Sequence, residues 1–357
     1  MTGVLVGEKM TFERWVESEG LDLVRGFYIE DLKAIPLKPW TRKGGLGVYI
    51  KLDGTGWENV AYVCEIPPGK ALKPQRHLYE ENIYILKGQG STRVWNDGGR
   101  EQTVEWKAGS LFAIPLNTRH EHVNRSPDEA VRYVAVTLAP SMMNLFRDTD
   151  FIFNIPHDFT NRFDGEPGYF SGEEKVFKDP GGFRGQILET NLVLDVPKHA
   201  LAEREERGAG GRNIRFEMAG NVMDCHVSEF PVGTYKKAHR HAGHAHVIIL
   251  SGKGYSLLWQ DGTPFQRVDW QAGSMIVPPD RCWHQHFNTG IAPARYLALH
   301  GMRSHKFKMG IESSEVKSSK EGGKQIEFED ELPEIREMFE KELVKLGLKC
   351  QMPVHKK

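Results

Sequence analysis

Short runs of alternating apolar and polar residues, separated by glycine, proline and asparagine turns, fill two stretches of the chain, at about 45–140 and 212–305. The runs have the length and the two-residue period of β-strands, and turn sequences such as NDGG at 96–99 are typical of hairpins. Many short strands joined by glycine turns favour closed or sandwich-like architectures. The pattern therefore predicts two all-β units in tandem.

Three further segments have a different pattern. Residues 1–44 are predicted to form an arm with a short amphipathic helix, and residues 141–211 an irregular bridge. The bridge ends in EREERGAGGRN, which we expect to be an exposed loop. In residues 306–357 a polar linker precedes a helix that starts near Pro333. One face of this helix is apolar and is expected to pack on a β unit or on a partner subunit: Ile335, Phe339, Leu343 and Leu346.

The two β units are copies of one another. Glycines and tryptophans of the first recur in the second at a constant offset of 164 positions (233 minus 69). Examples are Gly69 with Gly233, Gly88 with Gly252, Trp106 with Trp270 and Gly109 with Gly273. A chain of 357 residues also exceeds what one hydrophobic core usually serves. We therefore expect five parts: an arm (1–44), an N-terminal barrel (45–140), a bridge (141–211), a C-terminal barrel (212–305), and a linker with a helix (306–357).

Composition limits the possible function classes. The 47 Lys and Arg residues nearly balance the 48 Asp and Glu residues, so we expect no nucleic-acid or membrane binding by bulk charge. No apolar run is long enough to span a membrane, and charged residues interrupt the run that a signal peptide would need. The four cysteines are widely spaced and include no CxxC pair, which argues against a disulfide framework. These features indicate a soluble, cytoplasmic protein.

Histidines gather at equivalent places in the two units. In the second unit His239 and His241 are two residues apart, so on a strand their side chains share one face. His284 would arrive from a neighbouring strand. Three neutral imidazoles around one point, with positions left open for water or substrate, suit Fe(II), Mn, Co, Ni, Cu or Zn. The sequence therefore predicts a metal centre formed by these three residues.

The first unit has a modified version of this cluster. Gln75 takes the place of the first histidine, while His77, Glu81 and His120 remain. Glutamine binds a metal only weakly, through its carbonyl oxygen. We expect these four residues to be a structural element or a second, weaker metal site.

The spacing of these residues resembles the two motifs of the cupin superfamily, G-x5-H-x-H-x3,4-E-x6-G and G-x5-P-x-G-x2-H-x3-N. The second unit has Gly233-x5-His239-Arg240-His241-x3-Ala245-x6-Gly252, then Gly273-x5-Pro279 and His284-x3-Asn288. The first unit has Gly69-x5-Gln75-Arg76-His77-x3-Glu81-x6-Gly88, then Gly109-x5-Pro115 and His120-x3-Asn124. Neither has the glycine two residues after the proline. The resemblance to a bicupin implies two tandem double-stranded β-helix (jelly-roll) barrels, although this fold hosts many reactions.

The resemblance also implies a glutamate ligand at position 245, where this chain has Ala245. A three-histidine site has one negative charge fewer and one more open position, which suits an Fe(II) centre that binds O2 and a chelating substrate together. His246 is a possible fourth ligand if a bulge rotates its strand, whereas simple alternation would point it away. His286 is a candidate acid/base or hydrogen-bonding group or else a rim residue, and His122 holds the same place in the first unit.

The segment WHQHFN at 283–288, together with HRH at 239–241, is similar to sequences of gentisate and salicylate 1,2-dioxygenases. These are bicupins with a three-histidine iron site, usually in the N-terminal copy, whereas the complete set here is in the C-terminal copy. The resemblance implies an Fe(II) dioxygenase of a hydroxylated aromatic acid or a similar small chelating substrate.

Two other functions remain open. One is a non-oxidative metal-dependent enzyme, such as a decarboxylase, isomerase or hydrolase, in which the metal acts as a Lewis acid. The other is a bicupin that binds a small molecule without turnover. Bicupins of this kind often associate edge to edge, so we also expect a homo-oligomer.

Overall fold

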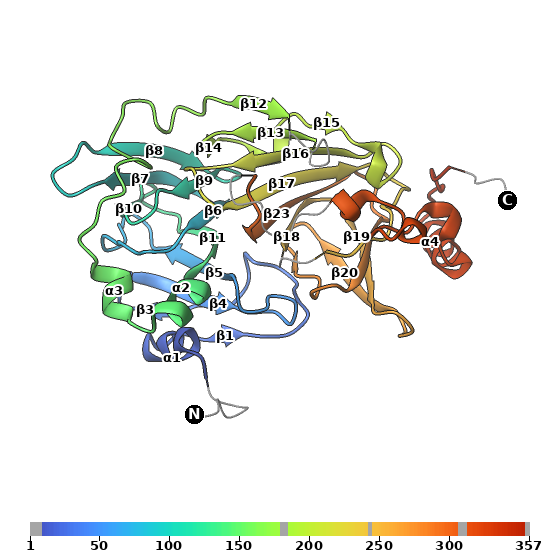
Figure 1. Cartoon of the computed structure of the whole chain (residues 1–357), viewed down its shortest axis with the longest axis horizontal. Coiled ribbons are helices and arrows are strands. Elements are labelled where there is room, and N and C mark those ends of the chain that lie inside the picture. Colours follow the sequence, from blue (N-terminus) through green and yellow to red (C-terminus); the bar gives the residue numbers. More distant parts are fainter. Residues whose placement is uncertain (1–8, 179–184, 242–244, 306–312, 354–357) are drawn as a thin grey trace.

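Two β-domains in tandem make up most of the chain, which confirms the fold predicted from the alternating pattern (Figure 1). The computed structural model describes residues 9–178, 185–241, 245–305 and 313–353. In each domain a large sheet packs against a three-stranded sheet. This arrangement places the histidine clusters inside the two domains.

The N-terminal domain is centred on the strands between residues 45 and 137. Its strands are β1 (Leu23–Val24), β3 (Lys38–Trp40), β4 (Gly45–Ile50), β5 (Val60–Ile66), β6 (Glu81–Lys87), β7 (Gln89–Trp95), β8 (Gln102–Lys107), β9 (Leu111–Ile114), β10 (Arg119–Asn124), β11 (Val131–Thr137) and β14 (Leu192–Val193). The large sheet has the order β1-β4-β5-β11-β6-β9-β14, with β3 beside β4, and the small sheet the order β10-β7-β8. Ile83 of the large sheet and Val94 and Trp106 of the small sheet belong to one buried cluster. The two sheets therefore face each other across a common core.

The C-terminal domain repeats this plan with the strands between residues 212 and 302. Its strands are β2 (Tyr28–Ile29), β12 (Lys175–Lys178), β13 (Gln186–Glu189), β15 (Ala202–Glu203), β16 (Arg212–Glu217), β17 (Met223–Phe230), β18 (His246–Ser251), β19 (Lys253–Trp259), β20 (Gln266–Gln271), β21 (Met275–Ile276), β22 (Trp283–Asn288) and β23 (Ala294–Met302). The large sheet has the order β12-β13-β16-β17-β23-β18-β21-β2, with β15 beside β16, and the small sheet the order β20-β19-β22. Val247 of the large sheet and Leu258 and Trp270 of the small sheet share its core.

Two very short strands of the flanking segments pair with strands of the β-domains. β2 lies in the N-terminal arm but pairs with β21 of the C-terminal domain, with Tyr28 opposite Ile276. β14 lies in the bridge but pairs with β9 of the N-terminal domain, with Leu192 opposite Phe112. Each flanking segment thus adds a strand to a sheet, so the arm and the bridge tie the two domains together.

The large sheets of the two domains meet in the middle of the molecule. Alternate residues of β11 and β23 belong to one buried cluster: Val134, Val136, Leu297 and Leu299. The residues between them, Ala135 and Ala298, lie in the separate cores of the two domains. Because successive side chains of a strand point to opposite faces, each of these strands contributes to two cores at once.

A buried carboxylate also joins the domains, and its removal is expected to destabilise the protein. Oε2 of Glu80 accepts hydrogen bonds from the backbone N–H groups of Val222 (2.8 Å) and Met223 (3.2 Å), and Oε1 accepts one from Arg162 (3.0 Å). Glu80→Ala should lower the free energy of unfolding by about 3 kcal/mol, because these buried donors lose a charged acceptor. Denaturant titration measures the loss.

The matched control for this variant is Glu105→Ala, which removes an exposed ion pair with Arg125. The control should cost less than about 1 kcal/mol. Equal losses in the two variants would show that the Glu80 contacts do not hold the domains together.

The helices lie at the edges of the β-domains. They are α1 (Thr11–Ser18), α2 (Ala139–Phe146), α3 (Thr149–Asn154) and α4 (Pro333–Lys345). Short 3-10 turns occur at η1 (Val196–Lys198), η2 (Glu205–Arg207), η3 (Ser313–Val316), η4 (Ser319–Glu321) and η5 (Phe328–Asp330). Within the described ranges, no helix has both the length and the apolar character needed to cross a membrane.

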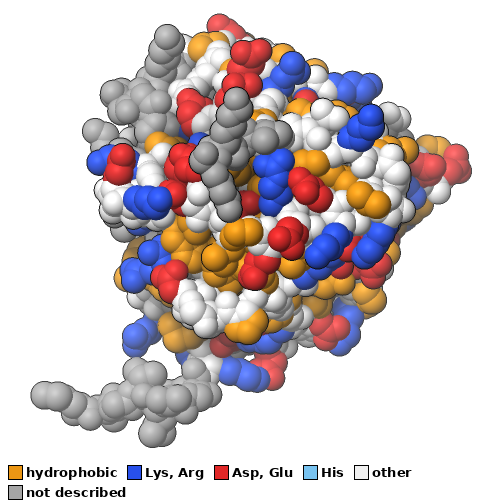
Figure 2. Space-filling view, turned by 90° about the vertical axis from the view of Figure 1, so that its right-hand side faces the viewer, with side chains coloured by type: hydrophobic (Ala, Val, Ile, Leu, Met, Phe, Trp, Pro, Cys, Tyr) orange, Lys and Arg blue, Asp and Glu red, His pale blue; other side chains and the backbone are white. Residues whose placement is uncertain are grey.

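Helix α4 confirms the predicted C-terminal helix. Ile335, Phe339 and Leu343 are buried against the outer face of the small sheet of the C-terminal domain, in one cluster with Tyr255 and Phe287. These three residues of the predicted stripe therefore pack within the chain rather than on a partner subunit, whereas the fourth, Leu346, lies just beyond α4 and is exposed. The homo-oligomer remains a prediction. On the side of the molecule that lies at the right of Figure 1, basic and acidic side chains are interspersed (Figure 2).

Candidate metal centre

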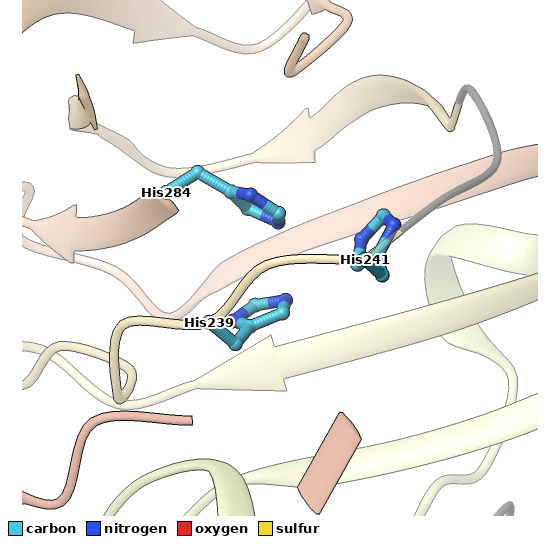
Figure 3. A group of neighbouring side chains, drawn as sticks. All are labelled: His239, His241 and His284. Carbon is cyan, nitrogen blue, oxygen red and sulfur yellow. The ribbon is translucent and has the colours of Figure 1, made fainter. Parts of the chain in front are cut away.

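Three histidines converge in the C-terminal domain (Figure 3). His239 and His241 lie on the extended segment before β18, and His284 lies on β22. Backbone hydrogen bonds join the two segments, from His239 N to His284 O (3.1 Å) and from His284 N to His239 O (2.9 Å). One ligand nitrogen from each ring lies within 4.8 Å of the others. The structure thus brings together the three residues that the sequence places at this site.

Backbone carbonyls orient two of these imidazoles. Nδ1 of His239 donates to Lys237 O (3.2 Å), and Nδ1 of His284 donates to Cys282 O (3.0 Å). A proton fixed on Nδ1 leaves the lone pair of Nε2 available to a metal. Burial lowers the pKa of all three histidines, that of His284 to about 4. The rings are therefore neutral near pH 7, as metal ligands must be, and the donor set fits a divalent metal.

A second group lies in the N-terminal domain. His77, Glu81 and His120 are fully buried, and their ligand atoms lie within 4.8 Å of one another. Nε2 of each histidine and Oε1 of Glu81 are buried without a hydrogen-bond partner in the part of the chain that the structure describes. Two imidazoles and a carboxylate are a common donor set for divalent metals. These three residues therefore also fit a metal.

Gln75, the fourth residue expected at this second site, uses its side chain for hydrogen bonds to other parts of the chain. Its carbonyl oxygen accepts a hydrogen bond from Arg42, and its amide donates to Lys73 O (3.0 Å) and Pro74 O (3.1 Å). The side chain is thus held by the arm and by its own segment. Arg42 lies outside the cupin motifs, so the motif spacing could not predict that its guanidinium donates a hydrogen bond to the Gln75 carbonyl oxygen.

Lys43 places a positive charge next to the N-terminal group. It is buried, and its Nζ donates to the hydroxyl of Tyr62 (2.8 Å), which donates to Oε2 of Glu81 (2.8 Å). Burial, followed by the Lys43 charge, lowers the pKa of His120 to about 3. A divalent ion at this site would be repelled by a fixed ammonium group. Arg303 lies comparably close to the C-terminal histidines, so which of the two sites is the weaker remains a prediction.

His246, the possible fourth ligand, lies away from the three histidines. Ala245 and Val247 belong to the core of the C-terminal domain, whereas Ile248 belongs to the core between the domains. By strand alternation His246 shares the face of Ile248 and points away from the site. The irregularity of β18 comes only between Ile249 and Ser251, so no bulge rotates His246 into the site.

His286 is buried beside His284 but does not line the cavity described below. Its Nδ1 lies 2.7 Å from the hydroxyl of Ser256, which also accepts a hydrogen bond from Trp270 (3.0 Å). The N-terminal domain has the same arrangement with His122, Thr92 and Trp106. Because it recurs in both domains, it supports a packing role, and the catalytic role predicted for His286 is left without structural support.

A cavity of about 70 Å³ opens onto His239 and His241. The described part of its wall carries six basic side chains: Arg204, Arg207, Arg212, Arg215, Lys236 and Arg303. Glu315 is the acidic residue of the same wall, and it pairs with Arg303 through two contacts of 3.0 and 3.1 Å. The arrangement gives a site of three histidines a strongly positive entrance, which attracts anions.

Sequence reasoning missed this wall. EREERGAGGRN was expected to be an exposed loop, and about half of its residues are exposed, but it also contains the end of β15, all of η2 and the start of β16, and it supplies Arg204, Arg207 and Arg212 to the cavity. The available signal was three arginines within one glycine-rich stretch. Such a charge run is usually a solvated surface, and only its contacts with distant strands show otherwise.

Comparison with known proteins agrees with this fold. A family model described as "Cupin domain" matches residues 62–137 and 226–300. The search of curated proteins finds no significant match. Among solved structures, the oxalate decarboxylase of Lactobacillus farciminis in its formate complex is 14% identical, with a TM-score of 0.52, over 78% of this chain and 86% of that chain.

A second similar structure comes from work on the Mn(II) centres of the Bacillus subtilis oxalate decarboxylase. It is 16% identical, with a TM-score of 0.51, over 79% of this chain and 78% of that chain. At such identities the likeness shows the fold alone. The finer resemblance to gentisate and salicylate dioxygenases remains a prediction. The paired family matches and the shared fold together show two tandem β-domains of the cupin type.

Proposed function

We propose that this bicupin is a metal-dependent, non-oxidative enzyme that acts on a small carboxylic acid, with decarboxylation as the leading reaction. The observation that carries the proposal is the cationic cavity that opens onto His239 and His241. A carboxylate in this cavity would lie among basic side chains and next to His239 and His241, and charge-assisted hydrogen bonds would hold it there. The shared fold of oxalate decarboxylases supports this choice of reaction.

A divalent metal held by His239, His241 and His284 would supply Lewis-acid chemistry, withdrawing electrons from the bond that breaks. The chain itself binds and orients the acid. Arg303 is fixed by its two contacts with Glu315 and lies beside His241, with 3.4 Å between Nη1 and Nδ1. Its guanidinium can therefore hold a carboxylate oxygen close to the metal ligands. We propose Mn(II) as the first metal to test, with Fe(II) as the second.

A second candidate is the Fe(II) dioxygenase implied by the sequence resemblance. Ala245 favours it, because a site without the carboxylate ligand keeps an additional open position for O2. The cavity wall argues against a hydroxylated aromatic substrate, since an aromatic ring needs apolar surfaces and Tyr296 is the aromatic residue of the described lining. The non-oxidative reaction is therefore the better-supported one.

The test is to purify the protein without added metal, load it with Mn(II) or Fe(II), and follow CO2 and O2 together in air-saturated buffer. Oxalate and malonate are the first substrates, and dihydroxybenzoates the second set. We expect release of CO2 without net consumption of O2, and loss of the activity after chelation. Stoichiometric O2 uptake with a dihydroxybenzoate would favour the dioxygenase. Metal binding without any turnover would favour a binding protein.

A further inference from the structure

Arg207 places a guanidinium in the wall of the cavity, and the carboxylate that acts on its charge there, Glu315, is already paired with Arg303. Nη1 of Arg207 is buried, and neither a hydrogen bond nor an ion pair to this side chain occurs within the described ranges. Burial lowers the pKa of Arg207 to about 10, so the group remains charged near pH 7. The residue as a whole is half-buried, but a buried charged donor without a hydrogen bond is energetically unfavourable. A ligand that brings a negative charge would satisfy it.

The backbone fixes Arg207 relative to the metal ligands. Arg207 ends η2, and its carbonyl accepts a hydrogen bond from the N–H of Lys237 (2.8 Å), two residues before His239. The next residue, Gly208, has φ +154°, and a Cβ there would lie 3.0 Å from Tyr235 O. Glycine therefore allows the loop to lie directly against the segment that leads to His239. These backbone contacts thus hold Arg207 at a defined position relative to His239.

Other basic residues of the wall already have protein partners. Arg215 pairs with Asp224, Arg303 pairs with Glu315, and Lys236 donates to the hydroxyl of Ser228. These groups form a fixed positive wall in which protein partners already take part of the hydrogen-bond donors. Arg207 differs from them because, within the described ranges, its side chain makes no hydrogen bond or ion pair.

We propose that Arg207 binds a second anionic group of the substrate, so that the site selects small dianions over monoanions. This rests on the proposed function, in which the first carboxylate lies at the three histidines. The planar guanidinium presents parallel N–H donors that match a carboxylate or a phosphate. A cavity of about 70 Å³ holds about five water molecules, so the two groups must be joined by a short chain.

Calorimetric titration of the Mn(II)-loaded protein tests this inference. The probes are malonate and succinate as dicarboxylates, phosphoglycolate as a phosphate, and acetate as the monoanion. Unmodified protein should bind the best dianion about tenfold or more tightly than acetate. Arg207→Gln should lose that preference while its affinity for acetate and its Mn(II) content stay unchanged. Whether a dicarboxylate or phosphoglycolate binds best identifies the second group.

Two further variants sharpen the test. Arg207→Lys keeps the charge but loses the parallel donors, so its preference should lie between those of the other two proteins. Lys253→Gln removes an exposed charge of β19 outside the cavity and should bind as the unmodified protein does. Thermal unfolding checks that each variant is folded.

An undiminished preference for dianions in folded Arg207→Gln would overturn the inference while leaving the proposed function intact. If the protein binds no metal, the proposed function fails, and the same titrations are made on the metal-free protein. There, a preference for dianions that disappears in Arg207→Gln would still support the role of Arg207. Its persistence, or its absence from the unmodified protein, would reject that role.

Discussion

Replacing His241 with alanine is expected to lower the metal affinity of the C-terminal site by about 100-fold or more, because one of three ligands is lost. The remaining rings, His239 and His284, are oriented by backbone carbonyls and cannot turn to replace the missing nitrogen. Turnover should fall in parallel. Metal content after dialysis, measured by elemental analysis, and the rate of CO2 release are the two readouts.

The comparison variant is His77→Ala, which removes a ligand of the N-terminal group. Its tightly bound metal should remain near the level of the unmodified protein, because Lys43 and Tyr62 already supply positive charge and hydrogen bonding around Glu81. Lys253→Gln controls for purification and handling. If metal is lost only from His77→Ala, the N-terminal domain holds the main site, and the assignment made here is wrong.

The fold was predictable because its signals are local and repeated. Strand alternation and glycine turns occur within a few residues, and the constant offset between Gly69 and Gly233 shows the duplication directly. The group of His239, His241 and His284 was predictable for the same reason. Two of its members share a face through strand geometry, and the third sits on the strand that pairs with them.

What the sequence did not reveal depends on contacts between distant segments. β2 and β14 are two residues long, too short for any period to show, and they are defined by their partners in other parts of the chain. The engagement of Gln75 by Arg42 and the burial of Lys43 beside the N-terminal group have the same origin. The position of Arg207 in the cavity wall has this origin too. A glycine- and arginine-rich stretch has the same sequence pattern whether it is solvated or packed against other strands.

Asp224 is one such distant contact: it holds two residues of the cavity wall without lining the cavity itself. It lies fully buried on β17, pairs with Arg215, and accepts a hydrogen bond from Nδ1 of His300 (2.7 Å). Both partners line the cavity, whereas Asp224 does not. Burial alone would raise the pKa of Asp224, but Arg215 and His300 lower it below its usual value. The carboxylate is therefore charged and positions two groups of the wall.

Asp224→Asn is expected to lower the free energy of unfolding by about 3–5 kcal/mol, because Arg215 is left as a buried charge without its partner. Denaturant titration at pH 7 measures the loss. The matched control, Asp269→Asn, removes an exposed pair with Arg267 and should cost less than about 1 kcal/mol. Adding Arg215→Met to Asp224→Asn should recover part of the loss, since the unpaired charge is then gone.

The pH dependence of this loss in stability distinguishes an effect of the Asp224 charge from an effect of the substitution on packing. The lowered pKa of Asp224 in the folded protein means that its carboxylate stabilises the fold above the unfolded value of about 3.9. That contribution is complete at pH 7 and is lost as the pH falls below about 4 towards the folded pKa. The difference in unfolding free energy between the unmodified protein and Asp224→Asn should therefore shrink between pH 5 and pH 3. A difference that stays constant over this range would mean that the variant acts through packing, and that Arg215 does not depend on the Asp224 charge.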